Sequence, residues 1–405
     1  MAGDCRIAPP VAHRPLDLVE WVVKPSTFCN LRCRYCYEWS GLSNRYRMPL
    51  DVWRRVALAI CQYHQMMDRG ERSGLSTRVI WHGGEPFALP PDYFELLLTE
   101  LAAAARHVGI PEERLINCVQ TNLTLITART LQTITAHGLR IGVSMDVVPG
   151  MRVDRAGRET EYVVLRNMER LRALGIEFGA ITVLAKHTYH TLCEIYEFWA
   201  KQGVNLRILP LFDGPADRDL AAFHVDEDEL VNALCKLFDH RLESRHVIQL
   251  DPLDEWLATV VRARMGLASM PYDRRAQGEN VLIVRPNGDL FQTNEIGDET
   301  LTLGNLGRET LQEILIGSAY DASLRRSEQV TADVCKDCRF WGSCDGYPAH
   351  TEKFNVKGGR RCPVAYGVFE YIDRALDRMG LSASELRALA ERDAGQDGND
   401  LAFSR

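Results

Sequence analysis

The stretch FCNLRCRYC, residues 28–36, decides the fold and the chemistry that the rest of the sequence supports. Its three cysteines stand at positions 29, 33 and 36. Cysteine thiolates hold iron–sulfur clusters, and a 4Fe–4S cluster takes four of them, so a local set of three leaves one iron without a protein ligand. Zinc is the alternative, but zinc modules pair their Cys or His ligands, and the next Cys or His after Cys36 is Cys61. The spacing therefore favours a cluster with an open iron.

Strand-like and helix-like segments alternate from this loop onward. The predicted strands are 18–23, 78–81, 115–120, 139–145, 176–184 and 204–209, and the predicted helices are 51–67, 92–106, 127–137, 159–174 and 191–201. Such alternation implies parallel strands joined by right-handed crossovers. Because the pattern changes after residue 209, we expect an α/β fold with a partial, TIM-like (β/α)6 barrel.

Polar motifs follow three of the predicted strands, at the end of a parallel barrel where active sites lie. They are HGGEP at 82–86, QTN at 120–122 and SMD at 144–146. Taken singly, each is an ordinary turn or helix cap, because Gly, Pro, Ser, Asn and Asp favour turns. Their shared position predicts a site, although no catalytic acid or base can be identified from the sequence.

The spacing C-x3-C-x2-C, with Tyr35 directly before the third cysteine, resembles the signature of the radical S-adenosylmethionine (SAM) enzymes. In that family the open iron binds SAM, one electron from the cluster cleaves it, and the resulting 5′-deoxyadenosyl radical removes hydrogen from the substrate. The resemblance implies that Cys29, Cys33 and Cys36 are the cluster ligands. It also implies the partial barrel as the fold.

The same resemblance places SAM at the strand ends. The GGEP motif is similar to the family segment that binds the SAM amino group, and glycines would let that group approach the main chain. Ser144 would face the ribose or carboxylate of SAM, Arg152 would bond to the carboxylate, and the strand 181–184 would line the adenine. The residues expected to bind SAM are Tyr35, Gly83, Gly84, Glu85, Pro86, Gln120, Asn122, Ser144, Arg152 and Leu184.

A second set of cysteines lies far downstream, at Cys335, Cys338, Cys344 and Cys362. Four thiolates complete one 4Fe–4S cluster or one zinc site, and the spacing alone leaves both open. The set resembles part of the SPASM domain, the auxiliary-cluster extension of radical SAM peptide-modifying enzymes, as does a hairpin predicted around Asn287 and Gly288. Thr293 and Pro348 stand where that pattern has further cysteines. The resemblance therefore implies one auxiliary cluster, for electron transfer or structure.

These features divide the chain into five expected segments. They are an N-terminal arm (1–17), the radical SAM partial barrel (18–215), a helical linker (216–275), a small SPASM-like or twitch-like α+β iron–sulfur domain (276–366), and C-terminal helices with a tail (367–405).

Composition favours a soluble, cytoplasmic enzyme. The 405 residues are 46% hydrophobic, enough to bury a large core. The formal charge is −7 without a strongly basic segment, so we do not expect nucleic acid as a partner. The N-terminus lacks an apolar signal region and no apolar run reaches the length of a membrane span. In a reducing compartment, the 12 cysteines fit metal ligands and buried thiols better than disulfides.

We expect a precursor peptide as the substrate and an external electron donor of the flavodoxin or ferredoxin type. Hydrogen would be removed from a side chain of a ribosomally made peptide, and a crosslink would form. Because crosslinking is a net oxidation, the downstream cysteine set would accept the remaining electron. Two alternatives stay open: a small-molecule dehydrogenase or epimerase with one auxiliary cluster, and a zinc-stabilised binding protein without SAM chemistry.

Overall fold

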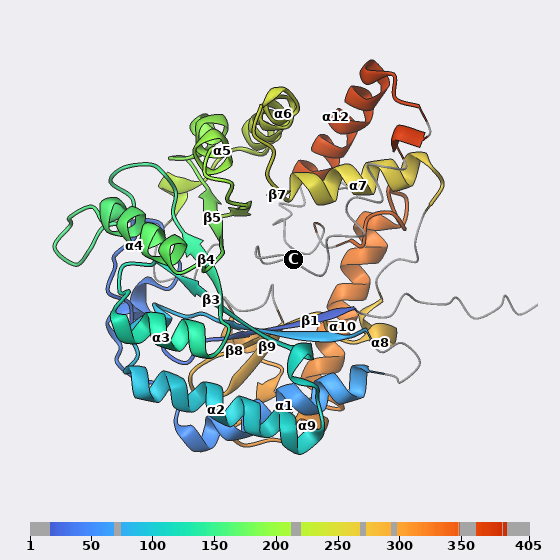
Figure 1. Ribbon diagram of the computed structural model, residues 1–405. Coiled ribbons are helices and arrows are strands. Elements are labelled where there is room, and N and C mark those ends of the chain that lie inside the picture. The colour runs from blue at the N-terminus through green and yellow to red at the C-terminus, as the bar shows by residue number, and fades with distance from the viewer. Residues whose placement is uncertain are drawn as a thin grey trace, which may run out of the picture.

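The computed structural model describes residues 17–68, 74–211, 220–267, 273–292, 298–346, 348, 362–382 and 384–386. Helices surround the outer side of a curved sheet, as Figure 1 shows. Within the described ranges, no helix has both the length and the apolar character of a membrane span.

The curved sheet is built from parallel strands in sequence order. These are β1 (Leu18–Val23), β2 (Ser76–Trp81), β3 (Leu115–Thr121), β4 (Arg140–Ser144), β5 (Phe178–Leu184), β6 (Leu206–Pro210) and β7 (Leu250–Asp251). The α-helices between β1 and β6 are α1 (Leu50–Met67), α2 (Pro91–Val108), α3 (Ala128–Ala136), α4 (Glu161–Ala173) and α5 (Leu192–Ala200). The six predicted strands and the partial barrel are confirmed, and β7 is an additional short strand.

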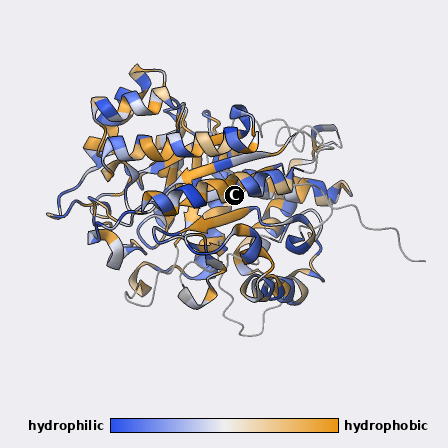
Figure 2. Ribbon diagram, turned by 90° about the horizontal axis from the view of Figure 1, so that it is seen from below, coloured by the Kyte–Doolittle hydropathy of each residue, from blue (hydrophilic) through white to orange (hydrophobic). Residues whose placement is uncertain are grey.

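Alternating side chains of the strands create two separate apolar regions. Val19, Trp21 and Val23 of β1 belong to the main core, which the strands share with the surrounding helices. Trp81 of β2 continues this core, and its ring centroid lies 5.1 Å from that of Trp53 on α1. Figure 2 shows the strands as largely hydrophobic and the helices as mixed, as expected for helices with one buried face.

The interior of the barrel holds a small apolar cluster and a buried ion pair. Ile80, Cys118 and Ile181 form the cluster. Arg78 Nη1 donates to Glu20 Oε1 at 2.7 Å, and both side chains are buried. This pair lies in the amino-terminal halves of β1 and β2, away from the strand ends that carry the polar motifs.

The C-terminal part of the chain adds strands to the same sheet. The predicted hairpin is present as β8 (Val281–Val284) and β9 (Asp289–Gln292), followed by β10 (Gly304–Asn305). β8 pairs in parallel with β1, from Glu20 opposite Val281 to Val23 opposite Val284. One sheet thus includes strands from both sides of residue 276, the boundary expected between the barrel and the C-terminal domain.

The remaining helices lie beside the barrel and beyond it. They are α6 (Glu227–Glu243), α7 (Leu253–Arg264), α8 (Arg274–Gln277), α9 (Leu311–Leu315), α10 (Ser318–Val330) and α12 (Pro363–Met379). Figure 1 shows α12 against α7 and near α6. Phe369 of α12 contacts Trp256 of α7 and Phe340, with ring centroids 5.8 and 5.1 Å away. These contacts fix the segment around Phe340 against the linker helices.

Candidate active site

The first three cysteines lie on the loop that connects β1 to a short 3-10 helix, η1 (Trp39–Ser43). The backbone N–H of Cys29 donates to the carbonyl oxygen of Leu42 at 3.0 Å. Two further N–H groups, those of Arg32 and Arg34, donate to carbonyl oxygens of the segment after β4 at 2.7 and 2.9 Å. The loop is therefore held between η1 and the loop that follows β4.

The chemistry of the three thiols fits an iron–sulfur cluster. Cys29 is buried, and Cys33 and Cys36 are half-buried beside it. Burial raises the pKa of the Cys29 and Cys36 thiols to about 12, so their thiolates require bound metal in place of the protons. Among the described residues, no three His, Cys, Asp or Glu side chains converge as a single metal ion requires. A cluster does not need that convergence, because several irons share its cysteine ligands.

Two glycines allow the turn after β2 to pack against the cysteine loop. A Cβ on Gly83, where φ is +111°, would lie 2.1 Å from the Ser26 carbonyl oxygen, and one on Gly84 would lie 2.2 Å from that of Phe28. The N–H groups of Gly84 and Glu85 donate to these two oxygens at 3.1 and 2.9 Å. We expected the glycines to make room for a cofactor amino group. The structure adds a second reason, because the glycines also make room for the main chain of the cysteine loop.

Gly84→Ala is expected to separate this turn from the cysteine loop. The added methyl group would overlap the carbonyl oxygens of Phe28 and Thr27, which lie 2.2 and 2.3 Å from its position. We expect a loss of about 3 kcal/mol in the free energy of unfolding and a lower iron content. Thermal unfolding and an iron assay measure both. Gly74→Ala is the matched control, because its methyl group meets no atom within 4 Å. Equal behaviour of the two variants would contradict this packing argument.

Glu85 joins the glycine turn to the end of β3. Its Oε1 accepts hydrogen bonds from the Phe87 N–H at 3.0 Å and the Thr121 hydroxyl at 2.7 Å, and its Oε2 accepts from the Asn122 N–H at 2.7 Å. Burial raises the pKa of Glu85 to about 7, while the three donors favour its ionised form. Its contact with the SAM amino group stays a prediction.

Side chains at the ends of β3 and β4 approach the cysteine loop and one another. Asn122 Nδ2 donates to Asn30 Oδ1 at 3.0 Å and lies 3.8 Å from Cys29 Sγ. Gln120 Nε2 donates to Ser144 Oγ at 2.5 Å. Gln120 Oε1 is buried and has no hydrogen-bond partner among the described residues. Because a buried acceptor is costly when unpaired, this oxygen fits a bound molecule that carries a donor.

Asp146 connects the cysteine loop to β4 and β5. Its carboxylate accepts a hydrogen bond from the Tyr35 hydroxyl, one from Arg152 Nε at 3.1 Å and one from the Val183 N–H at 3.1 Å. Burial alone would raise the pKa of Asp146, but the Arg152 guanidinium and the hydrogen bonds hold it well below its usual range. Arg152, expected to bond to the SAM carboxylate, is thus placed at the strand ends in an ion pair with Asp146.

His187 and Phe223 belong to the same cluster and were not predicted. The His187 ring stacks on Tyr35 with centroids 4.8 Å apart, and Phe223 meets the edges of both rings. The His187 side chain is only 6% exposed, and its Nε2 lies 3.5 Å from Asp146 Oδ2. Neither ring nitrogen has a hydrogen-bond partner among the described residues. The position of His187 just after β5 could have identified it as a site residue, because functional groups lie at this end of barrel strands.

His187→Ala is expected to lower the free energy of unfolding by about 3 kcal/mol, because it leaves a cavity beside Tyr35 and Phe223. His187→Phe should retain most of the stability, since an aromatic ring preserves the stacking and the variant gives up only the 3.5 Å contact between Nε2 and Asp146. The melting temperatures of the two metal-loaded variants provide the comparison. A Phe variant as unstable as the Ala variant would show that the ring nitrogens, and not the ring face, stabilise the site.

The last two predicted SAM-binding residues lie at the same edge of the sheet. Pro86 is buried at the start of a 3-10 turn, Pro86–Ala88. Leu184 is buried at the end of β5, and its carbonyl oxygen accepts a hydrogen bond from the Leu211 N–H at 3.2 Å. The structure therefore places every residue expected to bind SAM at the ends of β2 to β5, on the cysteine loop or in the loop after β4.

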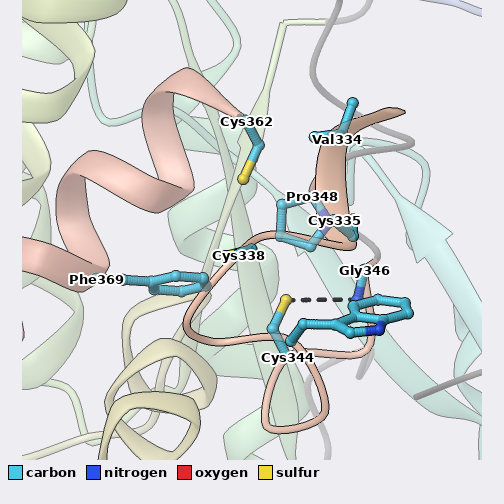
Figure 3. Close-up of a pocket in the computed structure, with 9 residues that line it drawn as sticks. Val334, Cys335, Cys338, Cys344, Gly346, Pro348, Cys362 and Phe369 are labelled. Atoms are coloured by element: carbon cyan, nitrogen blue, oxygen red, sulfur yellow. Dashed lines mark hydrogen bonds between the residues drawn. The ribbon is translucent and has the colours of Figure 1, made fainter. Parts of the chain in front are cut away.

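The four downstream cysteines line one cavity, shown in Figure 3. Cys335 ends a π-helical turn, Thr331–Cys335, and Cys362 directly precedes α12. Figure 3 shows the sulfur atoms of Cys344 and Cys362 pointing into the space between the loop and the helix. Cys344 Sγ also accepts a hydrogen bond from the Gly346 N–H at 3.4 Å.

This cavity also fits thiolate ligation. Apart from the cysteines, its lining consists of Val334, Trp341, Gly346, Pro348 and Phe369, none of which is titratable. Burial raises the pKa of Cys335 to about 12 and that of Cys344 well above its usual value. Deprotonating these thiols therefore costs free energy, which a bound metal group would offset. Pro348, which replaces an expected cysteine, lies on the cavity wall. Thr293, the other replacement, lies outside the described residues.

Comparison with known proteins agrees with this site. Residues 23–198 match the model of the radical SAM superfamily, a range that contains the three cysteines and the ends of β2 to β5. The chain is 24% identical to a serine-type anaerobic sulfatase-maturating enzyme of Bacteroides thetaiotaomicron, over 80% of this chain and 81% of the relative. It is 23% identical to a cysteine-type anaerobic sulfatase-maturating enzyme of Clostridium perfringens, over 82% and 88%.

Solved structures share the fold over most of the chain. Native anSMEcpe with bound AdoMet and Cp18Cys peptide has a TM-score of 0.68 at 17% identity, covering 93% of this chain and 99% of that one. Streptococcus suis SuiB bound to precursor peptide SuiA has a TM-score of 0.56 at 14% identity, covering 83% and 72%. The protein is a radical SAM enzyme, with the 4Fe–4S cluster and SAM of that class as its cofactors. Its sequence is similar to those of anaerobic sulfatase-maturating enzymes, and it shares its fold with SuiB.

Proposed function

We propose that this enzyme matures a ribosomally made precursor peptide by removing hydrogen from a side chain and forming a crosslink. The observation that carries the proposal is the four-cysteine cavity at α12, because it resembles the SPASM extension of peptide-modifying enzymes. Further support comes from the fold shared with anSMEcpe and SuiB, both determined with a peptide bound. Such an enzyme would work in a reducing, cytoplasmic environment.

When bound, the cluster and SAM supply a 5′-deoxyadenosyl radical that removes a hydrogen atom from the substrate. The chain would contribute the ligands Cys29, Cys33 and Cys36. Arg152 would provide a cation for the SAM carboxylate, and the unpaired Gln120 Oε1 would accept a hydrogen bond from the bound molecule. The aromatic and ionic contacts of Tyr35 would keep the cysteine loop in one position against β4 and β5.

We further propose that Cys335, Cys338, Cys344 and Cys362 bind one auxiliary 4Fe–4S cluster within a C-terminal domain at 276–366. Three other cysteines, Cys61, Cys118 and Cys235, are buried in apolar clusters, where burial raises their pKa values to about 12, 11 and 12. They fit core thiols rather than ligands. The two sets described above then account for seven cysteine ligands and two clusters.

The mass of the product tests this function. The anaerobically prepared enzyme is incubated with SAM, a reductant and a precursor peptide encoded beside its gene. We expect the peptide to lose two hydrogen atoms and to give no fragment ions between the two joined residues. An unchanged peptide mass with altered stereochemistry would indicate an epimerase instead. Turnover of a small molecule, with no change in the peptide, would support the small-molecule alternative.

The curated relatives favour a second candidate, the oxidation of a single Ser or Cys residue in a sulfatase. Sulfatase-maturating enzymes of both the serine type and the cysteine type match at least 80% of this chain. A peptide taken from a sulfatase is therefore the second substrate to assay. Modification of one residue leaves the fragment ions on both sides of it intact, so fragmentation separates this outcome from a crosslink.

A further inference from the structure

Beside the cysteine loop, the fold brings together arginines from two loops that are far apart in the sequence. The loop after β1 and the loop after β4 are joined by backbone hydrogen bonds, and Ser26 forms a β-bridge with Arg47. Arg158 is exposed on the second loop but pairs with Asp154, and the other exposed arginines of the two loops are Arg34, Arg45, Arg47 and Arg155. In the part of the chain that the structure describes, none of the four forms an ion pair. We call these arginines, with the exposed aromatic residues Trp39 and Tyr46, the cationic patch.

Two arginines of the cationic patch converge on one aromatic ring. The guanidinium carbons of Arg45 and Arg155 lie 5.1 and 5.8 Å from the centroid of the Phe28 ring. Each contact is favourable by about 0.5–1 kcal/mol at an exposed site, but the two positive charges repel each other. Phe28 directly precedes Cys29. An anionic group placed here would relieve the repulsion next to the first cysteine of the loop.

Nearby acidic residues leave the cationic patch positive. Glu38 forms an ion pair with Lys24, which is buried beneath the loop. Asp154 accepts from Arg158 Nη2 at 2.7 Å. Glu159 is exposed on the same loop, so it offsets only part of the charge of four arginines. The chain as a whole carries a formal charge of −7, which makes this local excess of positive charge opposite in sign to the rest.

Aromatic side chains give the cationic patch the composition of a protein interface. Trp39 is 38% exposed and Tyr46 is 47% exposed, and both lie on the segment that covers Cys29. Arginine and large aromatic residues are enriched where proteins bind one another and contribute most of the binding energy there. A surface for free phosphate or another small anion would not need these two exposed rings.

We propose that the cationic patch docks an acidic one-electron donor protein of the flavodoxin or ferredoxin type. This inference rests on the proposed assignment of Cys29, Cys33 and Cys36 as cluster ligands. The donor is oxidised by one electron and the group held by these cysteines is reduced by one, with no bond or proton transferred. Docking on the outer side of the same loop brings the donor close to that group, and complementary charge speeds the encounter.

The double variant Arg45→Glu, Arg155→Glu tests the proposal. We expect its Kd for a flavodoxin to rise about tenfold at low salt, with a smaller difference at high salt, because reversing rim charges weakens steering. Direct titration measures this without any turnover. The rate of 5′-deoxyadenosine formation should fall with flavodoxin as reductant and stay unchanged with dithionite, which needs no docking. The control, Arg106→Glu, changes an exposed arginine at the end of α2 distant from the strand ends.

The outcomes separate the donor site from the proposed function. An unchanged Kd for flavodoxin overturns the docking proposal, and a selective loss of affinity for the precursor peptide assigns the cationic patch to the substrate instead. If the reversed charges disturb folding, Arg45→Gln with Arg155→Gln should still weaken flavodoxin binding to an intermediate degree. Failure of the wild-type enzyme to cleave SAM with dithionite would refute the cluster assignment, whereas failure of the variants alone concerns only the docking surface.

Discussion

Simultaneous replacement of Cys29, Cys33 and Cys36 by Ala is expected to abolish 5′-deoxyadenosine formation and to remove one of two clusters. The iron content should fall from about eight to about four atoms per chain, since each 4Fe–4S cluster holds four irons. The remaining iron would belong to the downstream set, whose cavity lies on separate elements and does not include the cysteine loop. Iron analysis and product chromatography measure the two effects.

Cys118→Ala is the control for this variant, because Cys118 is a buried cysteine of the barrel interior. It should retain about eight irons and full SAM cleavage. Persistence of 5′-deoxyadenosine in the triple variant would falsify the mechanism. Zinc without iron in the wild-type protein would indicate a zinc-stabilised binding protein, and about twelve irons would contradict the single auxiliary cluster.

Cys344→Ala is expected to uncouple SAM cleavage from product formation. The variant keeps the barrel and its three cysteines, so 5′-deoxyadenosine should still form. The downstream set loses one of its four thiols, and the yield of crosslinked peptide should fall at least about tenfold. The ratio of peptide product to 5′-deoxyadenosine, followed over time by mass spectrometry, reports the uncoupling.

Cys193→Ala provides the comparison for Cys344→Ala. Cys193 is half-buried on α5, which contributes to neither cysteine set, so its replacement should change neither product. If Cys344→Ala also leaves the product ratio unchanged while the melting temperature falls, the downstream set has a structural role. A normal ratio and a normal melting temperature together would show that Cys344 is not a ligand.

The barrel could be predicted because its signals are local. Each of the first five predicted strands is an apolar run followed by a helix with its own periodicity, and neighbours in the sequence are neighbours in the sheet. The pairing of β8 with β1 could not be predicted, since nothing in the sequence of either strand identifies the other. β7 has only two residues, too few to show a periodic pattern.

The candidate site also combines features that could be predicted from the sequence with features that could not. The cysteine spacing and the glycine turn are short motifs, so they could be found without a structure. The stacking of His187 on Tyr35 and the cationic patch each bring together separate loops. Their residues are ordinary in the sequence, where a lone His or a few scattered arginines indicate nothing by themselves.

The position of β8 has a consequence for how the protein is made. β1 leads directly into the cysteines, and it is covered by β2 on one edge and by β8 on the other. While the ribosome has synthesised the barrel but not yet residues 281–284, that second edge is open and can pair with another chain. Nascent protein therefore passes through a stage in which the cysteine loop is supported on one side only. Cluster insertion during translation would have to act on this half-supported loop, whereas insertion after translation would meet the completed sheet.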